Sequence, residues 1–316
     1  MDNKNKRPIV SLCLPTNGVS EWVFPVLDSI YTQGVLENLF EVIVTDNGSN
    51  NDFREKIEKY KKQHTNLIYK KTEAYLFNNQ LEALKLASGI YLKFVNHRSV
   101  FKIGALQHIL GVIETNNESK PVIYFSCGEL TKEIYRLKSF DEFVSTLGHF
   151  ASWTTGVGIW KDDYDRIPMD IKFDKISPHS AILFSEKNKE SYIIDNFKFA
   201  EEIDTNHSKK GKYDLFKAFA VEELTITLNL YIDGDITAST FKKVKKDYKK
   251  FLCGLYSQFC IRHKPCSYDL SGFNDSMGIF YTKKSIIIGA YLHFFKALLK
   301  KIFRLFAKKE KLDDSF

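Results

Sequence analysis

The stretches IVSLCLPTNG (residues 9–18) and FEVIVTDNGS (residues 40–49) decide the fold. Each is a short apolar run that ends in turn-forming residues, which is typical of a buried strand followed by a tight connection. Further apolar runs lie at 67–71, 91–95 and 122–126, and amphipathic segments at 21–33, 52–62, 78–87 and 102–115 separate them. Strands that alternate with helices indicate βαβ units, so the sequence predicts an α/β fold with a mostly parallel sheet.

The composition is that of a globular protein, with 44% hydrophobic and 27% charged residues. These values exclude a disordered, collagen-like or disulfide-stapled chain. The five cysteines are widely spread and no pair has the spacing of a zinc ribbon. We interpret them as reduced thiols of a cytoplasmic protein. The polar N-terminus shows no signal peptide.

The net charge of +7 is concentrated at the C-terminus, because residues 283–316 hold nine basic residues against three acidic ones. A nucleic-acid-binding protein usually spreads basic charge over its folded body, so we expect no nucleic-acid partner. From residue 128 to about 206 the alternating pattern breaks up, and 135–147 looks helical. Two longer helices are expected at 213–230 and 239–262.

The C-terminal segment combines apolar and basic residues at helical spacing. Its apolar positions are Ile288, Tyr291, Leu292, Phe295, Leu298, Leu299, Ile302, Leu305 and Phe306, and its basic stripe is Lys296, Lys300, Arg304 and Lys308. This pattern predicts an amphipathic helix in the interface of an anionic membrane. The alternative is a helix that packs on the body of the protein with its lysines in water. The longest uncharged run, 285–295, is too short to span a bilayer.

Ligands of parallel α/β sheets bind beyond the carboxyl ends of the strands, and unusual residues fall there at 15–18, 46–49 and 96–99. Asp46 closes a buried strand, where a carboxylate can accept a hydrogen bond from a base or a ribose hydroxyl. The alternative is a turn, because Asn-Gly sequences commonly form one. The sequence contains neither GxGxxG nor a P-loop, so neither motif supports a dinucleotide or P-loop site.

The order of these features resembles the family 2 glycosyltransferases of the GT-A fold over about residues 9–115. The resemblance is carried by strand–Pro15-Thr16-Asn17, by FEVIVTDNGS and by Ala87-Ser88-Gly89-Ile90-Tyr91 before the strand 91–95. It implies a nucleotide-diphosphate sugar donor and transfer with inversion. We expect seven residues to contact the nucleotide, some from the resemblance and the others from their position in the sequence. They are Pro15, Thr16, Asn17, Asp46, Asn78, Asn96 and Arg98.

The sequence departs from the family where a metal-binding DxD motif is expected, because it reads Asn96-His97-Arg98 there. DxD carboxylates hold a divalent ion that neutralises the departing diphosphate. Three interpretations stay open. Arg98 pairs with the diphosphate without a metal, Asn96 and His97 help to hold Mn²⁺ or Mg²⁺, or the protein is a catalytically impaired relative.

Inverting transfer also needs a general base and an acceptor site. His179, which follows a proline at an expected helix start, is our first candidate for the base, with Asp174 and Asp163 as carboxylate alternatives. Trp153, Thr154, Thr155 and Trp160 are expected to contact the acceptor, since tryptophan faces stack on sugars and hydroxyls bond to them. The alternative for the two tryptophans is core packing.

The sequence thus predicts a glycosyltransferase of bacterial surface polysaccharide synthesis. It would act on a lipid-linked glycan while bound peripherally to the inner face of the cell membrane. A non-catalytic sugar-nucleotide or glycan-binding subunit is the alternative. We expect a nucleotide-sugar half at 1–127, an acceptor half at 128–210, a helical region at 211–282 and the basic helix at 283–316.

Overall fold

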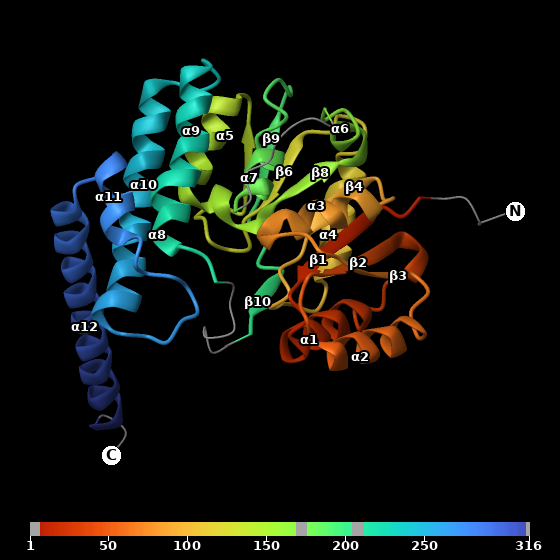
Figure 1. Ribbon diagram of the computed structural model, residues 1–316, viewed down its shortest axis with the longest axis horizontal. Coiled ribbons are helices and arrows are strands. Elements are labelled where there is room, and N and C mark those ends of the chain that lie inside the picture. The colour runs from red at the N-terminus through yellow and green to blue at the C-terminus, as the bar shows by residue number, and fades with distance from the viewer. Residues whose placement is uncertain (1–6, 169–175, 204–211, 314–316) are drawn as a thin grey trace, which may run out of the picture. The chain divides into compact units, whose positions relative to one another are not determined.

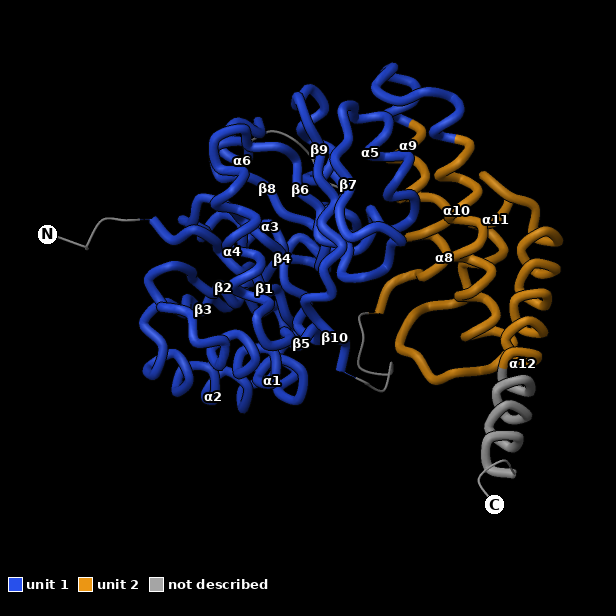
Figure 2. The backbone as a smooth tube through the Cα atoms, turned by 180° about the vertical axis from the view of Figure 1, so that it is seen from behind, with its two compact units in different colours: residues 1–204, 229–241 blue, residues 205–228, 242–316 orange. Residues whose placement is uncertain are grey.

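A computed structural model describes residues 7–168, 176–203 and 212–313, with side chains up to residue 300. The chain folds into two compact units, one of residues 1–204 and 229–241 and one of residues 205–228 and 242–316 (Figure 2). The predicted nucleotide and acceptor halves therefore lie in the first unit up to residue 204. Asp174, one candidate base, lies outside the described residues.

The central sheet of the first unit has the strand order β3-β2-β1-β4-β8 (Figure 1). Its strands are β3 (Leu67–Lys71), β2 (Phe40–Asp46), β1 (Val10–Thr16), β4 (Tyr91–Phe94) and β8 (Gly158–Trp160). All neighbours are parallel except β8, which runs antiparallel to β4. The helices are α1 (Ser20–Tyr31), α2 (Asn51–Lys61), α3 (Asn79–Leu86) and α4 (Ala105–Thr115). The predicted α/β fold with a mostly parallel sheet is confirmed.

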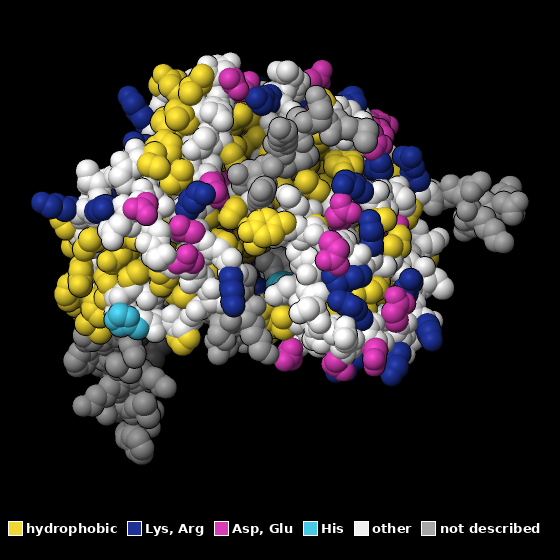
Figure 3. All heavy atoms as spheres, in the orientation of Figure 1, with side chains coloured by type: hydrophobic (Ala, Val, Ile, Leu, Met, Phe, Trp, Pro, Cys, Tyr) yellow, Lys and Arg dark blue, Asp and Glu magenta, His cyan; other side chains and the backbone are white. Residues whose placement is uncertain are grey.

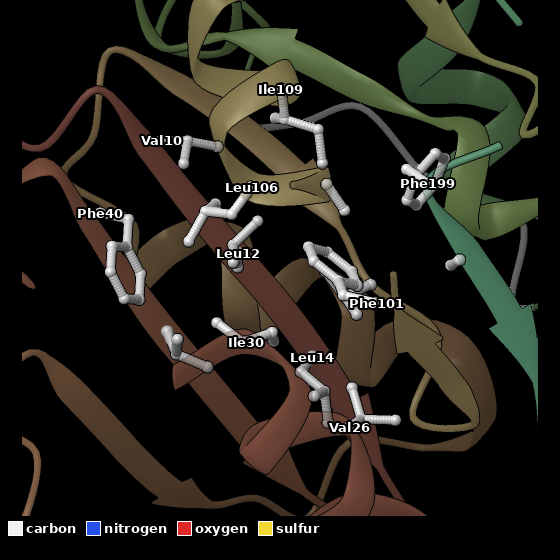
Figure 4. Packing of buried hydrophobic residues seen from close by; sticks show 14 of the residues in the cluster. Val10, Leu12, Leu14, Val26, Ile30, Phe40, Phe101, Leu106, Ile109 and Phe199 are labelled. Atoms are coloured by element: carbon white, nitrogen blue, oxygen red, sulfur yellow. The ribbon is translucent and has the colours of Figure 1, made fainter. Parts of the chain in front are cut away.

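The core forms because β1 alternates its side chains between the two faces of the sheet. Val10, Leu12 and Leu14 are fully buried and pack with α1 and α4, whose Val26 and Leu106 belong to the same cluster (Figure 4). β5 (Ser99–Phe101) pairs with β10 (Ala200–Glu202), and Phe101 and Phe199 extend this core. The core thus holds together strands that are far apart in the sequence.

A second sheet of this unit has the order β6-β9-β7, from β6 (Val122–Phe125), β9 (Tyr192–Asp195) and β7 (Ile134–Leu137). The strand expected at 122–126 therefore exists but does not join the central sheet. The helix expected at 135–147 is wrong in its first part. Residues 134–137 pair with β9, and α5 (Phe140–Leu147) begins after Ser139, whose hydroxyl caps it by accepting from the Glu142 amide. α6 (Lys161–Tyr164) and α7 (Pro178–Leu183) follow β8.

The second unit is helical, with α8 (Leu215–Lys217), α11 (Phe273–Phe280) and α12 (Lys283–Asp313), while α9 (Glu223–Ile232) and α10 (Ala238–Tyr256) each belong partly to both units. Its core contains Phe216, Leu252, Met277, Ile286 and Ala290. The long basic segment thus forms the predicted helix, and its first turns are anchored in this core. No helix among the described residues is long and apolar enough to cross a membrane.

Candidate active site

The loops that follow β1 and β2 touch at the carboxyl edge of the sheet. Thr16 and Asp46 are partners in the β1–β2 register, and the Asn47 amide donates to the Thr16 carbonyl at 3.1 Å. A Cβ on Gly48 would lie 2.0 Å from the Asn17 carbonyl oxygen. Because that distance is impossible, the close approach of the two loops requires glycine at position 48.

Asp46 lies in this edge as a buried hydrogen-bond acceptor, with no exposed surface. Its carboxylate accepts from the Gly48 amide at 2.7 Å and from the Tyr69 hydroxyl at 3.1 Å. Burial raises the pKa of the Asp46 carboxyl, and these two hydrogen bonds oppose the rise. Asp46 therefore forms the turn that was given as the alternative for this residue. Its contact with a nucleotide stays a prediction.

Asn79, the first residue of α3, joins the ends of β1 and β2. Its amide nitrogen donates to the carbonyls of Thr16 at 3.2 Å and Thr45 at 2.8 Å, and its oxygen accepts from the Thr72 hydroxyl. Asn78 makes no capping hydrogen bond, and its side-chain oxygen is buried without a hydrogen-bond partner in the described part of the chain. The second asparagine is thus structural, and the contact of the first with a nucleotide stays a prediction.

The residues that replace the DxD motif form a turn at the end of β4. The Asn96 side-chain oxygen accepts from the Arg98 amide at 3.1 Å. His97 Nδ1 lies 2.9 Å from the Thr16 hydroxyl, and its ring meets Trp22 edge-on at 5.1 Å. The structure therefore brings Thr16 and His97 together, as expected for residues that follow the carboxyl ends of neighbouring parallel strands.

Arg98 is held beside the same tryptophan. Its guanidinium carbon lies 5.7 Å from the centre of the Trp22 ring, and Nη1 lies 3.8 Å from Glu202 Oε2. The Arg98 side chain is 11% exposed, and its Nε is buried without a hydrogen-bond partner in the described residues. Glu202 was missed by sequence analysis because it reaches Arg98 only through the pairing of β10 with β5.

The donor groups at this turn do not fit Mg²⁺ or Mn²⁺. Hard cations prefer several carboxylate or carbonyl oxygens, and here the Asn96 oxygen already accepts a hydrogen bond while Arg98 adds a positive charge. Within the described residues, no three histidine, cysteine, aspartate or glutamate side chains group to hold a metal ion.

The loop before β8 carries the predicted acceptor residues. Trp153 and Thr154 are half-buried, and Gln80 of α3 donates to the Thr154 hydroxyl at 3.5 Å. Thr155 is buried. Trp160 is 1% exposed and its indole donates to the Pro121 carbonyl at 2.6 Å, which is the core packing given as the alternative for this tryptophan. It is a core residue, because β8 directs it against Tyr91 at the opposite end of β4.

His179 and Asp163 are both buried. His179 is 5% exposed on α7, and its Nε2 donates to the Ser152 carbonyl at 2.9 Å. With the proton on Nε2, the basic nitrogen of this ring is Nδ1, and the catalytic role of His179 stays a prediction. Asp163 is bound by Lys189 at 2.7 Å and by Arg166, so it serves as the centre of an ion-pair cluster.

The fold is of the GT-A type, which is found in glycosyltransferases. Residues 11–177 match the family described as glycosyl transferase family 2, and the chain belongs to that family. No curated protein matches the sequence. The family explains why the motifs of the first unit occur in this order.

Solved structures of glycosyltransferases share the fold. S. aureus TarS 1-349 in complex with UDP-GlcNAc is 17% identical, with a TM-score of 0.54 over 86% of this chain and 80% of that one. The mannosyltransferase PcManGT from Pyrobaculum calidifontis, in complex with GDP-Man and Mn²⁺, is 12% identical, with a TM-score of 0.50 over 92% and 88%. The protein spans only about half, 48%, of the chain in a longer TarS structure.

Proposed function

We propose that this enzyme transfers a sugar, with inversion, from a nucleotide-diphosphate donor to a glycan acceptor. The observation that carries the proposal is the convergence of Thr16, Asp46 and the turn of residues 96–98 from three strand ends on one edge of a parallel sheet, where such sheets bind ligands. The structures with UDP-GlcNAc and GDP-Man support a nucleotide sugar as the donor.

Arg98 takes the part of the metal ion in this proposal. A guanidinium offers five N–H donors in a planar fork that matches the oxygens of a diphosphate. Its contact with Glu202 is long, at 3.8 Å, and its buried Nε has no partner among the described residues, so its hydrogen-bonding capacity is not used up within this part of the chain. Trp22 and its neighbour His97 restrict the position of the side chain. The positive charge can therefore meet the leaving diphosphate at little cost in ordering.

The acceptor binds, on this proposal, over the loop that contains Trp153 and Thr154. His179 contacts that loop directly, which favours it as the base over Asp163, whose charge is already matched by Lys189. Asp174 stays the carboxylate alternative. Either group would take the proton of the acceptor hydroxyl as that oxygen attacks the anomeric carbon.

The surface of α12 supports a lipid-linked acceptor. Ile286 and Ala290 are buried in the core of the second unit, whereas Ile288, Tyr291, Leu292, Phe295, Leu298 and Leu299 are 43–61% exposed. We call these six residues the exposed α12 face, and hydrophobic side chains gather over this helix in Figure 3. Lys296 and Lys300 are exposed with them. A basic helix with an uncovered apolar face suits the surface of an anionic membrane.

We therefore propose a peripheral enzyme on the cytoplasmic side of a bacterial membrane, where it extends a lipid-linked glycan of a surface polysaccharide. Each basic residue adds roughly 1 kcal/mol near an anionic surface, and burial of each large apolar side chain adds about 1.5–3 kcal/mol before ordering costs. The summed binding free energy of the basic and apolar residues exceeds the contribution of any one of them, so membrane binding should survive the loss of one side chain.

Nucleotide binding tests the proposal. We expect a UDP or GDP sugar to bind the protein in EDTA, measured by calorimetry, and Asp46→Asn to weaken binding about tenfold or more. Asparagine keeps an oxygen for the Gly48 amide, so the loop should fold. Asp52→Asn is the control, because Asp52 is an exposed residue of α2 paired with Lys56. If no nucleotide sugar binds, the proposed function is wrong. Unchanged affinity in folded Asp46→Asn would remove that residue from the site.

A further inference from the structure

The loop of residues 148–157, which we call the β8 loop, is held through its backbone carbonyls. The carbonyl of Phe150 accepts from the Tyr124 hydroxyl, that of Ser152 from His179 Nε2, that of Thr155 from Lys93 Nζ and that of Val157 from the Phe94 amide. The donors come from β6, α7 and β4. A loop fixed in this way presents its side chains in a single arrangement.

Lys93 is unusual among these donors because it is a lysine with no exposed surface. Its Nζ lies 2.6 Å from the Thr155 carbonyl oxygen and 3.4 Å from that of Phe94. The rings of Phe125 and Phe199 flank it, with centres at 4.6 and 4.7 Å. Two carbonyls and two aromatic faces thus take the place of water around the ammonium.

No carboxylate within the described residues forms an ion pair with Lys93, so its charge is balanced only at longer range. The groups that act on it are the thiol of Cys127 and the carboxylate of Asp195, which itself pairs with His108 at 3.0 Å. Burial lowers the pKa of Lys93 to about 7. The ammonium therefore exists in acid and is lost as the pH rises through neutrality.

We propose that Lys93 is a positioning residue for glycosyl transfer, whose buried amino group fixes the β8 loop so that Trp153 and Thr154 face the acceptor. Opening of the loop lets water reach Lys93 and returns its pKa toward the ordinary value, so protonation favours the open loop and loss of the proton favours the closed one. The loop is therefore loose in acid, and acceptor binding strengthens as the pH rises through neutrality. This proposal rests on the proposed function in one respect, namely that the β8 loop binds a glycan acceptor.

Hydrogen exchange followed by mass spectrometry tests it on the full chain, without donor or acceptor. Exchange rates from pH 6 to pH 8.5 are divided by the intrinsic chemical rates, and peptides of 148–157 are compared with those of α4. We expect protection in the β8 loop of the wild-type protein to rise about fivefold between pH 6 and pH 8.5, while α4 stays unchanged.

Two variants separate charge from packing. Lys93→Met should show loop protection that does not change with pH, because methionine carries no titrating proton. Lys93→Arg should keep low loop protection to pH 8.5, because a guanidinium stays charged there. Loop protection independent of pH in the wild-type protein would overturn the proposal, even if neither variant folds. Because no nucleotide is present, that result is distinct from a failure to bind nucleotide sugars.

Discussion

Replacement of Lys93 by methionine should change how the stability of the first unit depends on pH. Lysine has an ordinary pKa of 10.5, and burial lowers it to about 7 in the folded protein. Between these values the unfolded chain holds a proton on Lys93 that the folded protein lacks, so the free energy of unfolding rises with pH. A methionine has no such proton. The wild-type protein should therefore gain stability relative to Lys93→Met as the pH rises from 7.5 to 9.5.

The expected gain follows from the two pKa values. One pKa unit corresponds to about 1.4 kcal/mol, and the part of the shift that falls between pH 7.5 and pH 9.5 amounts to roughly 2.5 kcal/mol. At pH 7.5 the methionine variant should be the more stable protein, because the wild-type protein must bury an amine that the unfolded chain keeps charged in water.

Urea unfolding followed by tryptophan fluorescence measures this difference. Trp22, Trp153 and Trp160 all lie in the first unit, so the signal reports on the part of the chain that contains Lys93. Lys62→Met, at an exposed position after α2, is the control and should run parallel to the wild-type protein. A difference between wild type and Lys93→Met that stays constant from pH 7.5 to pH 9.5 would refute the reasoning.

Three further outcomes are expected. Transferase activity should persist in EDTA and fall at least 100-fold in Arg98→Gln, with exposed Arg136→Gln as the control; a strict need for Mn²⁺ or Mg²⁺ would contradict this. Serine at Leu292, Phe295 and Leu299 should abolish the binding to anionic vesicles that remains in high salt. As a control, serine at the exposed Leu36 and Ile103 should leave that binding unchanged. Wild-type protein that fails to sediment with vesicles at low salt would count against the membrane proposal. Gly48→Ala should lower the free energy of unfolding by about 2 kcal/mol or more in urea titration, since its Cβ meets the Asn17 carbonyl, and an unchanged midpoint would show that the loop can relax.

Local patterns in the sequence predicted the features that depend on neighbouring residues. Apolar runs ending in Thr-Asn-Gly and Asp-Asn-Gly identified β1 and β2 and the edge where Thr16 and Asp46 meet. Helical spacing predicted α12. The errors were also local: Tyr135 fits a helix by pattern, and only the neighbouring strand β9 makes it part of β7.

The tertiary structure decided what depends on pairing between distant segments. Arg98 meets Glu202 because β5 pairs with β10, and Trp160 enters the core because β8 runs antiparallel to β4. Lys93 interrupts an apolar strand, which the sequence displays, but its burial depends on Thr155, Phe125 and Phe199 closing around it. The physical reason is that strand periodicity is a property of a few consecutive residues. The surroundings of a charge, and hence its pKa, are set by chains that fold back from elsewhere.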